Sequence, residues 1–155
     1  MKISFRKLAD RQVLHCVRND HSQTWVSVQA FTVRHDFMHL AAETELEWHN
    51  GFFGLIATGW NIEDFSRSSV PDCAKPTIPE DALRMEHLVG ILDNSCDQAF
   101  GVFSEMLALS CTGARLVTPN VSAAQFIRII GSYKQLVNAW DELPRGASLT
   151  FSFPL

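Results

Sequence analysis

The apolar residues of this chain change their spacing near residue 30 and change it back near residue 148. In segments 2–7, 12–19 and 24–31, apolar and polar side chains alternate, which is the period of a half-buried β-strand. The last residues, S-L-T-F-S-F, alternate again, and we expect them to pair with the N-terminal strands. Strands first, helices next and one strand last predict an α+β fold. Its small antiparallel sheet, an N-terminal meander plus the C-terminal strand, would pack against about four helices.

The middle of the chain has helical spacing, interrupted by glycine and proline. The first helix should begin at Asp36, whose side chain can cap it, and should end before Gly51. The glycine-punctuated segment 51–65 is expected to form a short buried turn or helix, with its glycines at positions of close packing against bulky aromatic residues. The proline-containing segment 66–79 is the longest expected loop. The expected helices span residues 36–47, 80–93, 97–110 and 122–143.

Length and composition limit the function classes. A chain of 155 residues with 46% hydrophobic and 19% charged residues predicts one globular domain, residues 1–155. The net charge of −4, without a run of lysine or arginine, argues against nucleic acid or an acidic membrane as a partner. The N-terminus lacks the apolar core of a signal peptide. We therefore expect a cytoplasmic protein with reduced thiols, and Cys73 in the proline-containing loop is expected to be inert.

One stretch, R-H-D-F-M-H-L-A-A-E-T-E at residues 34–45, concentrates side chains that bind metals or move protons. At 100° per residue, His35, His39 and Glu43 fall on one narrow stripe of an otherwise largely apolar helix. The two histidines are then about 6 Å apart along the axis, the spacing of the zinc ligands in H-E-x-x-H metalloproteases. The pattern H-D-x-x-H predicts a metal site, with Asp36 in the position of the catalytic base.

A complete site needs a ligand from another segment, because His35 and Glu43 lie about 12 Å apart on a straight helix. Glu43 is either a ligand, if the helix is irregular at His35, or the group that orients His39. Glu86 is the best further ligand, since it lies at the border of the apolar face of the second expected helix. Weaker candidates are His49, Glu63, Asp64 and His87.

Two functions fit this pattern. The first is a metal-dependent hydrolase acting on an unknown small molecule or peptide. Its divalent ion, which the ligand types suggest is zinc, would activate a water molecule whose proton Asp36 accepts. The second is a non-enzymatic interaction or oligomer-forming protein, with a second copy as a potential partner, in which the His/Glu cluster is a structural polar network. A stripe facing solvent is the remaining alternative.

The sequence also resembles an uncharacterised family of small bacterial proteins. The resemblance rests on H-D-F-M-H-L-A-A-E, then G-F-F-G-L and G-W, then a helix with a glutamate at the position of Glu86. The early hairpin departs from the family, because Asp20-His21 stands where Asp-Gly is expected. The resemblance covers most of the chain and implies that His35, Asp36, His39, Glu43 and Glu86 belong together, but it implies no substrate.

Overall fold

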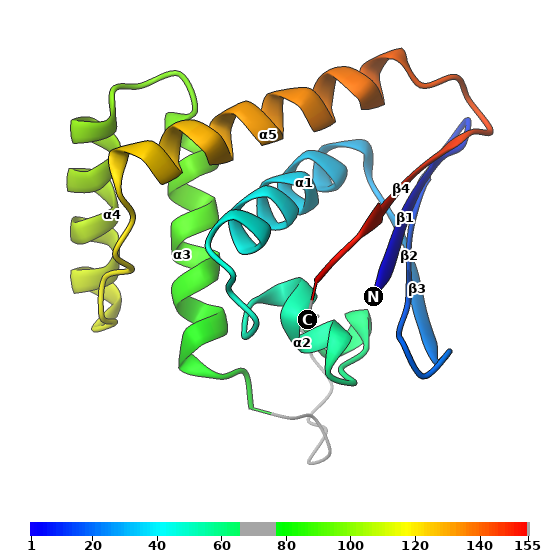
Figure 1. Cartoon of the computed structure of the whole chain (residues 1–155), viewed down its shortest axis with the longest axis horizontal. Helices are drawn as coiled ribbons and strands as arrows, with labels where there is room; N and C mark the ends of the chain where they lie inside the picture. Colours follow the sequence, from blue (N-terminus) through cyan, green and yellow to red (C-terminus); the bar gives the residue numbers. More distant parts are fainter. Residues whose placement is uncertain (66–76, 155) are drawn as a thin grey trace.

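The computed structural model describes residues 1–65 and 77–154 and shows an α+β fold (Figure 1). Within these residues, a four-stranded antiparallel sheet of order β3-β2-β1-β4 stands beside five α-helices and one short 3-10 helix, η1. The strands are β1 (Lys2–Lys7), β2 (Gln12–Val17), β3 (Gln23–Val28) and β4 (Ser148–Ser152). The helical elements are α1 (Ala30–Glu45), α2 (Phe52–Ala57), η1 (Ile62–Phe65), α3 (Glu80–Ser95), α4 (Phe100–Ala114) and α5 (Ala123–Glu142).

The C-terminal strand joins the N-terminal meander, as its alternation predicted. β4 pairs with β1 in antiparallel register, with Phe5 opposite Leu149 and Ile3 opposite Phe151. The chain ends close the pair further, because the Met1 ammonium donates to the carbonyl of Phe153 at 2.9 Å. The sheet therefore depends on residues from both ends of the sequence.

The β2–β3 hairpin shows how the turn forms with His21 at the position where the resemblance leads us to expect glycine. Asp20 Oδ1 accepts hydrogen bonds from the backbone N–H and the hydroxyl of Ser22, at 2.9 and 2.7 Å. His21 adopts a left-handed conformation with φ of 68°, which glycine would adopt with less strain. The Asp20 side chain thus organises a turn around an unfavourable residue.

The first helix begins six residues earlier than predicted, at Ala30 rather than Asp36. Gln29 occupies the capping position, and its side chain makes no capping hydrogen bond. The prediction of a cap at Asp36 was wrong because the strand-like alternation was extended through residues 29–31, whereas β3 ends at Val28. His35 therefore lies within the helix and not at its start.

The later helices agree with the sequence, with shifted ends. α3 extends to Ser95, and α4 runs from Phe100 to Ala114 rather than from 97 to 110. α5 begins where predicted, with a reciprocal capping box between Ser122 and Gln125. Of the expected loop 66–79, residues 66–76 lie outside the described part of the chain.

Helix α1 lies between the sheet and α3, with α5 running across it (Figure 1). Its Phe37 and Leu40 pack into the cluster formed with the sheet, whereas Met38 and Ala42 pack into the cluster formed with α3, α4 and α5. Burial on two flanks explains the apolar circumference of this helix and leaves only a narrow polar stripe.

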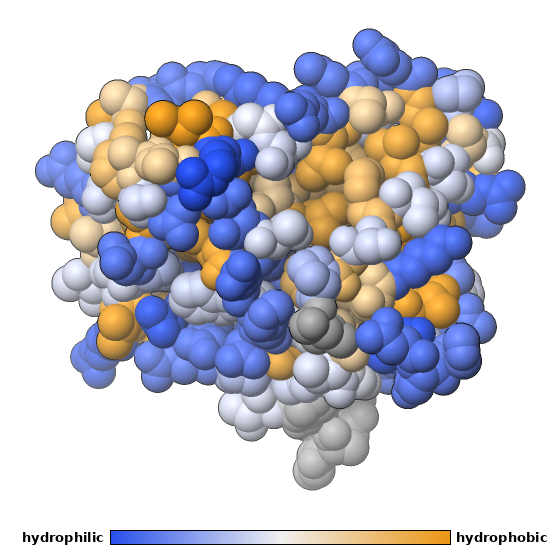
Figure 2. Space-filling view, viewed as in Figure 1, coloured by the Kyte–Doolittle hydropathy of each residue, from blue (hydrophilic) through white to orange (hydrophobic). Residues whose placement is uncertain are grey.

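Two further features complete the fold. Figure 2 shows apolar side chains gathered beneath α5, where a hollow between α1, α5 and β4 is lined by Leu40, Leu136 and Phe151. The buried Arg18 donates to the carbonyls of Ile56 and Trp60, and so attaches the end of α2 to the hairpin. No helix in the described ranges is both long enough and apolar enough to cross a membrane.

Candidate metal centre

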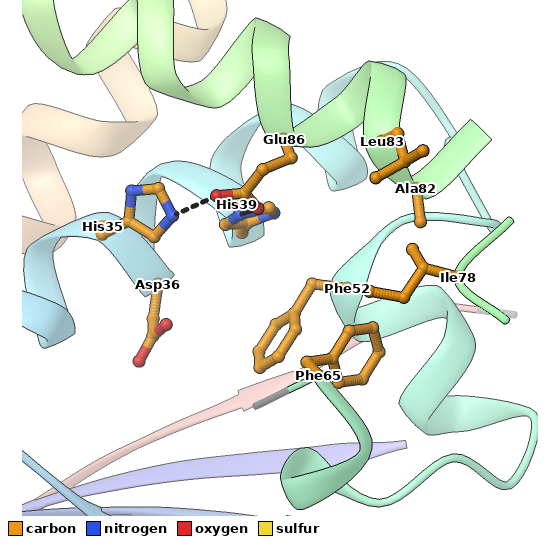
Figure 3. Close-up of a pocket in the computed structure, with 9 residues that line it drawn as sticks. All are labelled: His35, Asp36, His39, Phe52, Phe65, Ile78, Ala82, Leu83 and Glu86. Atoms are coloured by element: carbon orange, nitrogen blue, oxygen red, sulfur yellow. Dashed lines mark hydrogen bonds and ion pairs between the residues drawn. The ribbon is translucent and has the colours of Figure 1, made fainter. Parts of the chain in front are cut away.

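Helices α1 and α3 bring two histidines and a glutamate together (Figure 3). The rings of His35 and His39 lie edge to face, with centroids 4.9 Å apart. Glu86 reaches both of them: its Oε2 is 3.1 Å from His39 Nε2, and its Oε1 is 3.4 Å from His35 Nε2. One potential ligand atom from each of the three side chains lies within 4.8 Å of the others. The predicted convergence of the helix pair with Glu86 is therefore present.

The opposite nitrogen of each histidine is bonded to a second carboxylate. His35 Nδ1 lies 2.7 Å from Asp93 Oδ2, and His39 Nδ1 lies 3.0 Å from Glu43 Oε1. Such partners hold the proton on Nδ1, so that loss of the Nε2 proton makes the Nε2 lone pair available to a metal. Both Nε2 atoms face Glu86.

Glu43 sits in a socket made by two glycines of the G-F-F-G segment. Its Oε2 accepts a hydrogen bond from the Gly54 backbone N–H at 3.0 Å, and its side chain is fully buried. A Cβ at Gly51 would lie 2.5 Å from the Glu43 carboxyl carbon, and one at Gly54 would lie 2.1 Å from the His49 carbonyl oxygen. Close packing at these glycines is confirmed, but it is against Glu43 and the His49 backbone rather than against aromatic rings.

The carboxylates govern the protonation of the two histidines. The hydrogen bond to Asp93, followed by that to Glu86, raises the pKa of His35 to about 10. Burial by itself lowers the pKa of His39, but its hydrogen bonds to Glu43 and Glu86 outweigh burial and raise it to about 9. The same bonds hold the pKa of Glu86 well below its usual range. A metal ion must displace these protons, so its affinity will rise with pH.

Asp36 is the unusual carboxyl group of the cluster. It is 6% exposed, and within the described ranges its Oδ2 has no hydrogen-bond partner. Burial raises its pKa to about 6. An unpaired buried carboxyl oxygen costs stability; Oδ2 itself is closed to solvent, while the residue lies on the wall of a cavity.

The cavity beside the three converging side chains has a volume of about 380 Å³ (Figure 3). One side of it is polar and the other is apolar. The polar side carries His35, Asp36, His39 and Glu86, and the apolar side carries Phe52, Phe65, Ile78, Ala82 and Leu83.

The weaker candidates lie elsewhere. Asp64 accepts a hydrogen bond from the Asn61 backbone, and His87 is bonded through Nδ1 to Ser110 on α4. Neither His49 nor Glu63 joins the converging group. Glu43 is also outside it, since both of its oxygens are already occupied by His39 and Gly54. The thiol Cys73 lies outside the described residues.

Sequence reasoning missed Asp93. It follows Glu86 by seven residues, or two helical turns, so both carboxylates lie on the same face of α3. That spacing, opposite a histidine pair of spacing four, is a signal that could have identified it. With the geometry established, comparisons with known proteins add nothing: no family model, curated protein or solved structure matches this chain.

Proposed function

We propose that the protein binds a divalent metal ion through His35, His39 and Glu86, and that it is a metal-dependent hydrolase. One observation carries the proposal: each imidazole is held by a separate carboxylate on Nδ1, while both Nε2 atoms face the same third carboxylate. This is the arrangement by which carboxylates orient metal-binding histidines.

The ligand types support zinc as the ion. Two imidazoles and one carboxylate form a ligand set of catalytic zinc sites, which keep a fourth position open. Zinc bonds of about 2.0–2.1 Å would place ligand atoms about 3.4 Å apart in a tetrahedron. The three atoms lie within 4.8 Å of one another, so the most widely spaced pair must approach by up to about 1.4 Å on binding. The Glu86 side chain is 60% exposed, which leaves it room to adjust.

The cavity supports hydrolysis. A bound divalent ion supplies a Lewis acid that lowers the pKa of a water ligand. Asp36 lies on the same cavity wall, and burial raises its pKa to about 6. A base with a pKa near neutrality is suited to accept the proton of the attacking water. The carboxylic acid so formed can return that proton to the leaving group.

A structural network is the competing function, and one observation favours it. All four imidazole nitrogens already have carboxylate partners within 3.4 Å. Charged histidines could therefore stabilise the contact between α1 and α3 without any ion, in a protein that acts by binding a partner or a second copy of itself.

Metal analysis separates the two functions. Protein purified without a histidine tag should contain zinc, nickel, iron or manganese near one equivalent per chain. Metal-free protein should bind zinc in a calorimetric titration, and His39→Ala should abolish that binding. His87→Ala is the control, because His87 is a half-buried histidine that is also hydrogen-bonded but lies on the α4 side of α3. Absence of metal, together with no change in melting temperature when zinc is added, would favour the structural network.

A second variant tests the hydrolase separately from the metal. Asp36→Asn removes the base but none of the three ligands, so zinc should still bind. Hydrolysis of a panel of aryl esters and amides should fall by about two to four orders of magnitude, as expected for loss of a general base. Equal rates in the wild type and Asp36→Asn would exclude Asp36 as the base.

We also propose that the chain belongs with the bacterial family that it resembles. The structure offers a physical reason for the joint occurrence of H-D-x-x-H-x-x-x-E and G-F-F-G. The glutamate of the first pattern, Glu43, fits because Gly51 of the second lacks a side chain, and it accepts a hydrogen bond from the Gly54 N–H.

A further inference from the structure

The metal centre is surrounded by more negative charge than an ion can neutralise. Four carboxylates contact or adjoin the two histidines: Asp36, Glu43, Glu86 and Asp93. With neutral histidines and a bound divalent ion, the cluster keeps two negative charges. Among the described residues, no lysine or arginine lines this cavity.

The net charge of the cluster stays negative whether or not an ion is bound and whether or not Asp36 is protonated. Without metal, two fully charged histidines still leave two negative charges, and neutral histidines leave four. If Asp36 is protonated, at least one negative charge remains in each case. Solvent screens the buried part of this charge weakly, because the His39 and Glu43 side chains are 4% and 0% exposed, and it screens the 60%-exposed Glu86 more strongly.

The second observation is the unpaired oxygen of Asp36. The residue is more than nine-tenths buried and lies on the cavity wall, and its Oδ2 lacks a donor in the described part of the chain. That oxygen is itself closed to solvent, so a ligand with an N–H group would bond to the part of Asp36 that lines the cavity, whereas a carboxylate or phosphate would place a second acceptor beside it.

The third observation is the apolar wall. Phe52 packs against His39 with ring centroids 5.5 Å apart and against Phe65 at 4.9 Å. Leu83 extends this surface from α3 and is 41% exposed. A cavity of about 380 Å³ with such a wall has room for one aromatic ring or branched aliphatic group beside the polar cluster.

We infer that the cavity binds small apolar amines or amides, and that it discriminates against carboxylates and phosphate esters of the same size. The inference deepens the proposed hydrolase by naming its substrate class, and for that reaction it rests on the proposed function. The ligand places its apolar group on Phe52, Phe65 and Leu83 and its N–H group on Asp36.

Four probes that share one aromatic ring test the charge preference: benzylamine, benzamide, benzoate and phenyl phosphate. Each is titrated into zinc-loaded and metal-free protein and followed by chemical shifts of the chain. Benzylamine and benzamide should bind about tenfold more tightly than either anion, a difference of about 1.4 kcal/mol. Anions that bind as tightly as the amine, or more tightly, would overturn the inference.

Two variants locate the binding. Asp36→Asn should weaken benzylamine binding by about tenfold, as expected for a lost hydrogen bond to a charged group. Glu45→Gln is the matched control, since Glu45 lies on the same helix but pairs with Arg128 outside the cavity. Leu83→Ala, at an exposed position that folding does not require, should weaken benzylamine but leave methylamine unchanged. Unaltered benzylamine affinity in both Asp36→Asn and Leu83→Ala would place the ligand elsewhere.

The two proposals can fail separately. If zinc does not bind but the order of the four probes holds in the metal-free protein, the hydrolase is wrong and the ligand class stands. If zinc binds with one equivalent and the anions are preferred, the metal centre stands and the ligand class is wrong.

Discussion

The two histidines of the candidate centre make nearly the same bonds in different surroundings. The His39 and Glu43 side chains are 4% and 0% exposed, whereas the His35 and Asp93 side chains are 33% and 27% exposed. Each pair joins an Nδ1 to a carboxylate, and each histidine faces Glu86 through Nε2. The same chemistry should therefore contribute differently to stability, because an uncompensated charge is far more costly when it is buried.

The His39–Glu43 pair, the buried half of the centre, is also more constrained than the His35–Asp93 pair, the exposed half. Glu43 is fixed by the Gly54 N–H and enclosed against Gly51. Asp93 lies instead beside a second, open hollow that Arg34 and Tyr133 also line. We therefore expect the buried half to determine folding, and the exposed half to contribute mainly to ligand and metal binding.

The largest effect should come from His39→Ala. The substitution leaves Glu43 buried with the Gly54 N–H as its remaining partner, and breaking a buried pair costs about 3–5 kcal/mol. Urea denaturation of metal-free wild type and variant measures the loss directly.

Chelation with EDTA tests whether a bound metal adds to the stability that His39→Ala loses. If wild type carries an ion, EDTA should lower its melting temperature towards that of His39→Ala, because an ion bound only to the native state stabilises it. If EDTA has no effect while the variant still loses stability, the buried half is a purely structural pair. If His39→Ala loses no more stability than His35→Ala, the expected difference between the two histidines is wrong.

The next effect is a loss of stability at high pH in the metal-free protein. The pKa values of His35 and His39 are raised from 6.5 to about 10 and about 9. Their contribution is therefore fully present below pH 6.5 and is lost as the pH rises through 9 to 10. Denaturation midpoints between pH 6 and 10 should fall steadily, and His35→Ala and His39→Ala should each flatten the curve. A flat wild-type curve would show that the histidines are neutral in the folded protein.

Much of the fold could be predicted from periodicity. The alternation of Leu149, Phe151 and Phe153 identified a strand that needed a partner, and β1 provides it. The start of the first helix was missed because residues 29–31 continue the alternation of β3, whereas the strand ends at Val28 and the helix begins at Ala30. Alternation over a few residues does not mark that boundary, because strand preference depends on packing context.

The part of the candidate site that lies on a single helix could be predicted from the sequence. The spacing of four between His35 and His39 follows directly from helical geometry, and Glu86 was found from its place on an amphipathic face. From the sequence, Glu43 could be either a metal ligand or the group that orients His39, and the sequence did not decide between the two. One of the Glu43 oxygens accepts a hydrogen bond from Gly54, which lies eleven residues further along the chain. The other lies beside the His39 ring, whose position depends on its side-chain rotamer. Tertiary packing sets both.

The glycine socket predicts a sharp difference between two glycine substitutions. Gly54→Ala should cost about 1–3 kcal/mol or more, as overpacking does, because its Cβ would meet the His49 backbone at 2.1 Å. Gly90→Ala is the matched control on α3, where a Cβ would meet nothing within 4 Å. It should stabilise the protein by about 0.4–1 kcal/mol. Thermal denaturation compares the two, and a tolerated Gly54→Ala would mean that the socket is not tightly packed.

The smallest effect on stability should come from His35→Ala. His35 lies in the second turn of α1 and not at a frayed helix end, so its smaller contribution follows from exposure alone. Water can solvate Asp93 and Glu86 after the ring is removed, and partly exposed ion pairs contribute about 1 kcal/mol or less. Zinc affinity should nevertheless fall as severely as in His39→Ala, because each variant removes one of three ligands. Paired urea and zinc titrations of the two variants test this separation. If His35→Ala destabilises the chain as much as His39→Ala, the two halves are equivalent; if it leaves zinc affinity unchanged, His35 is not a ligand.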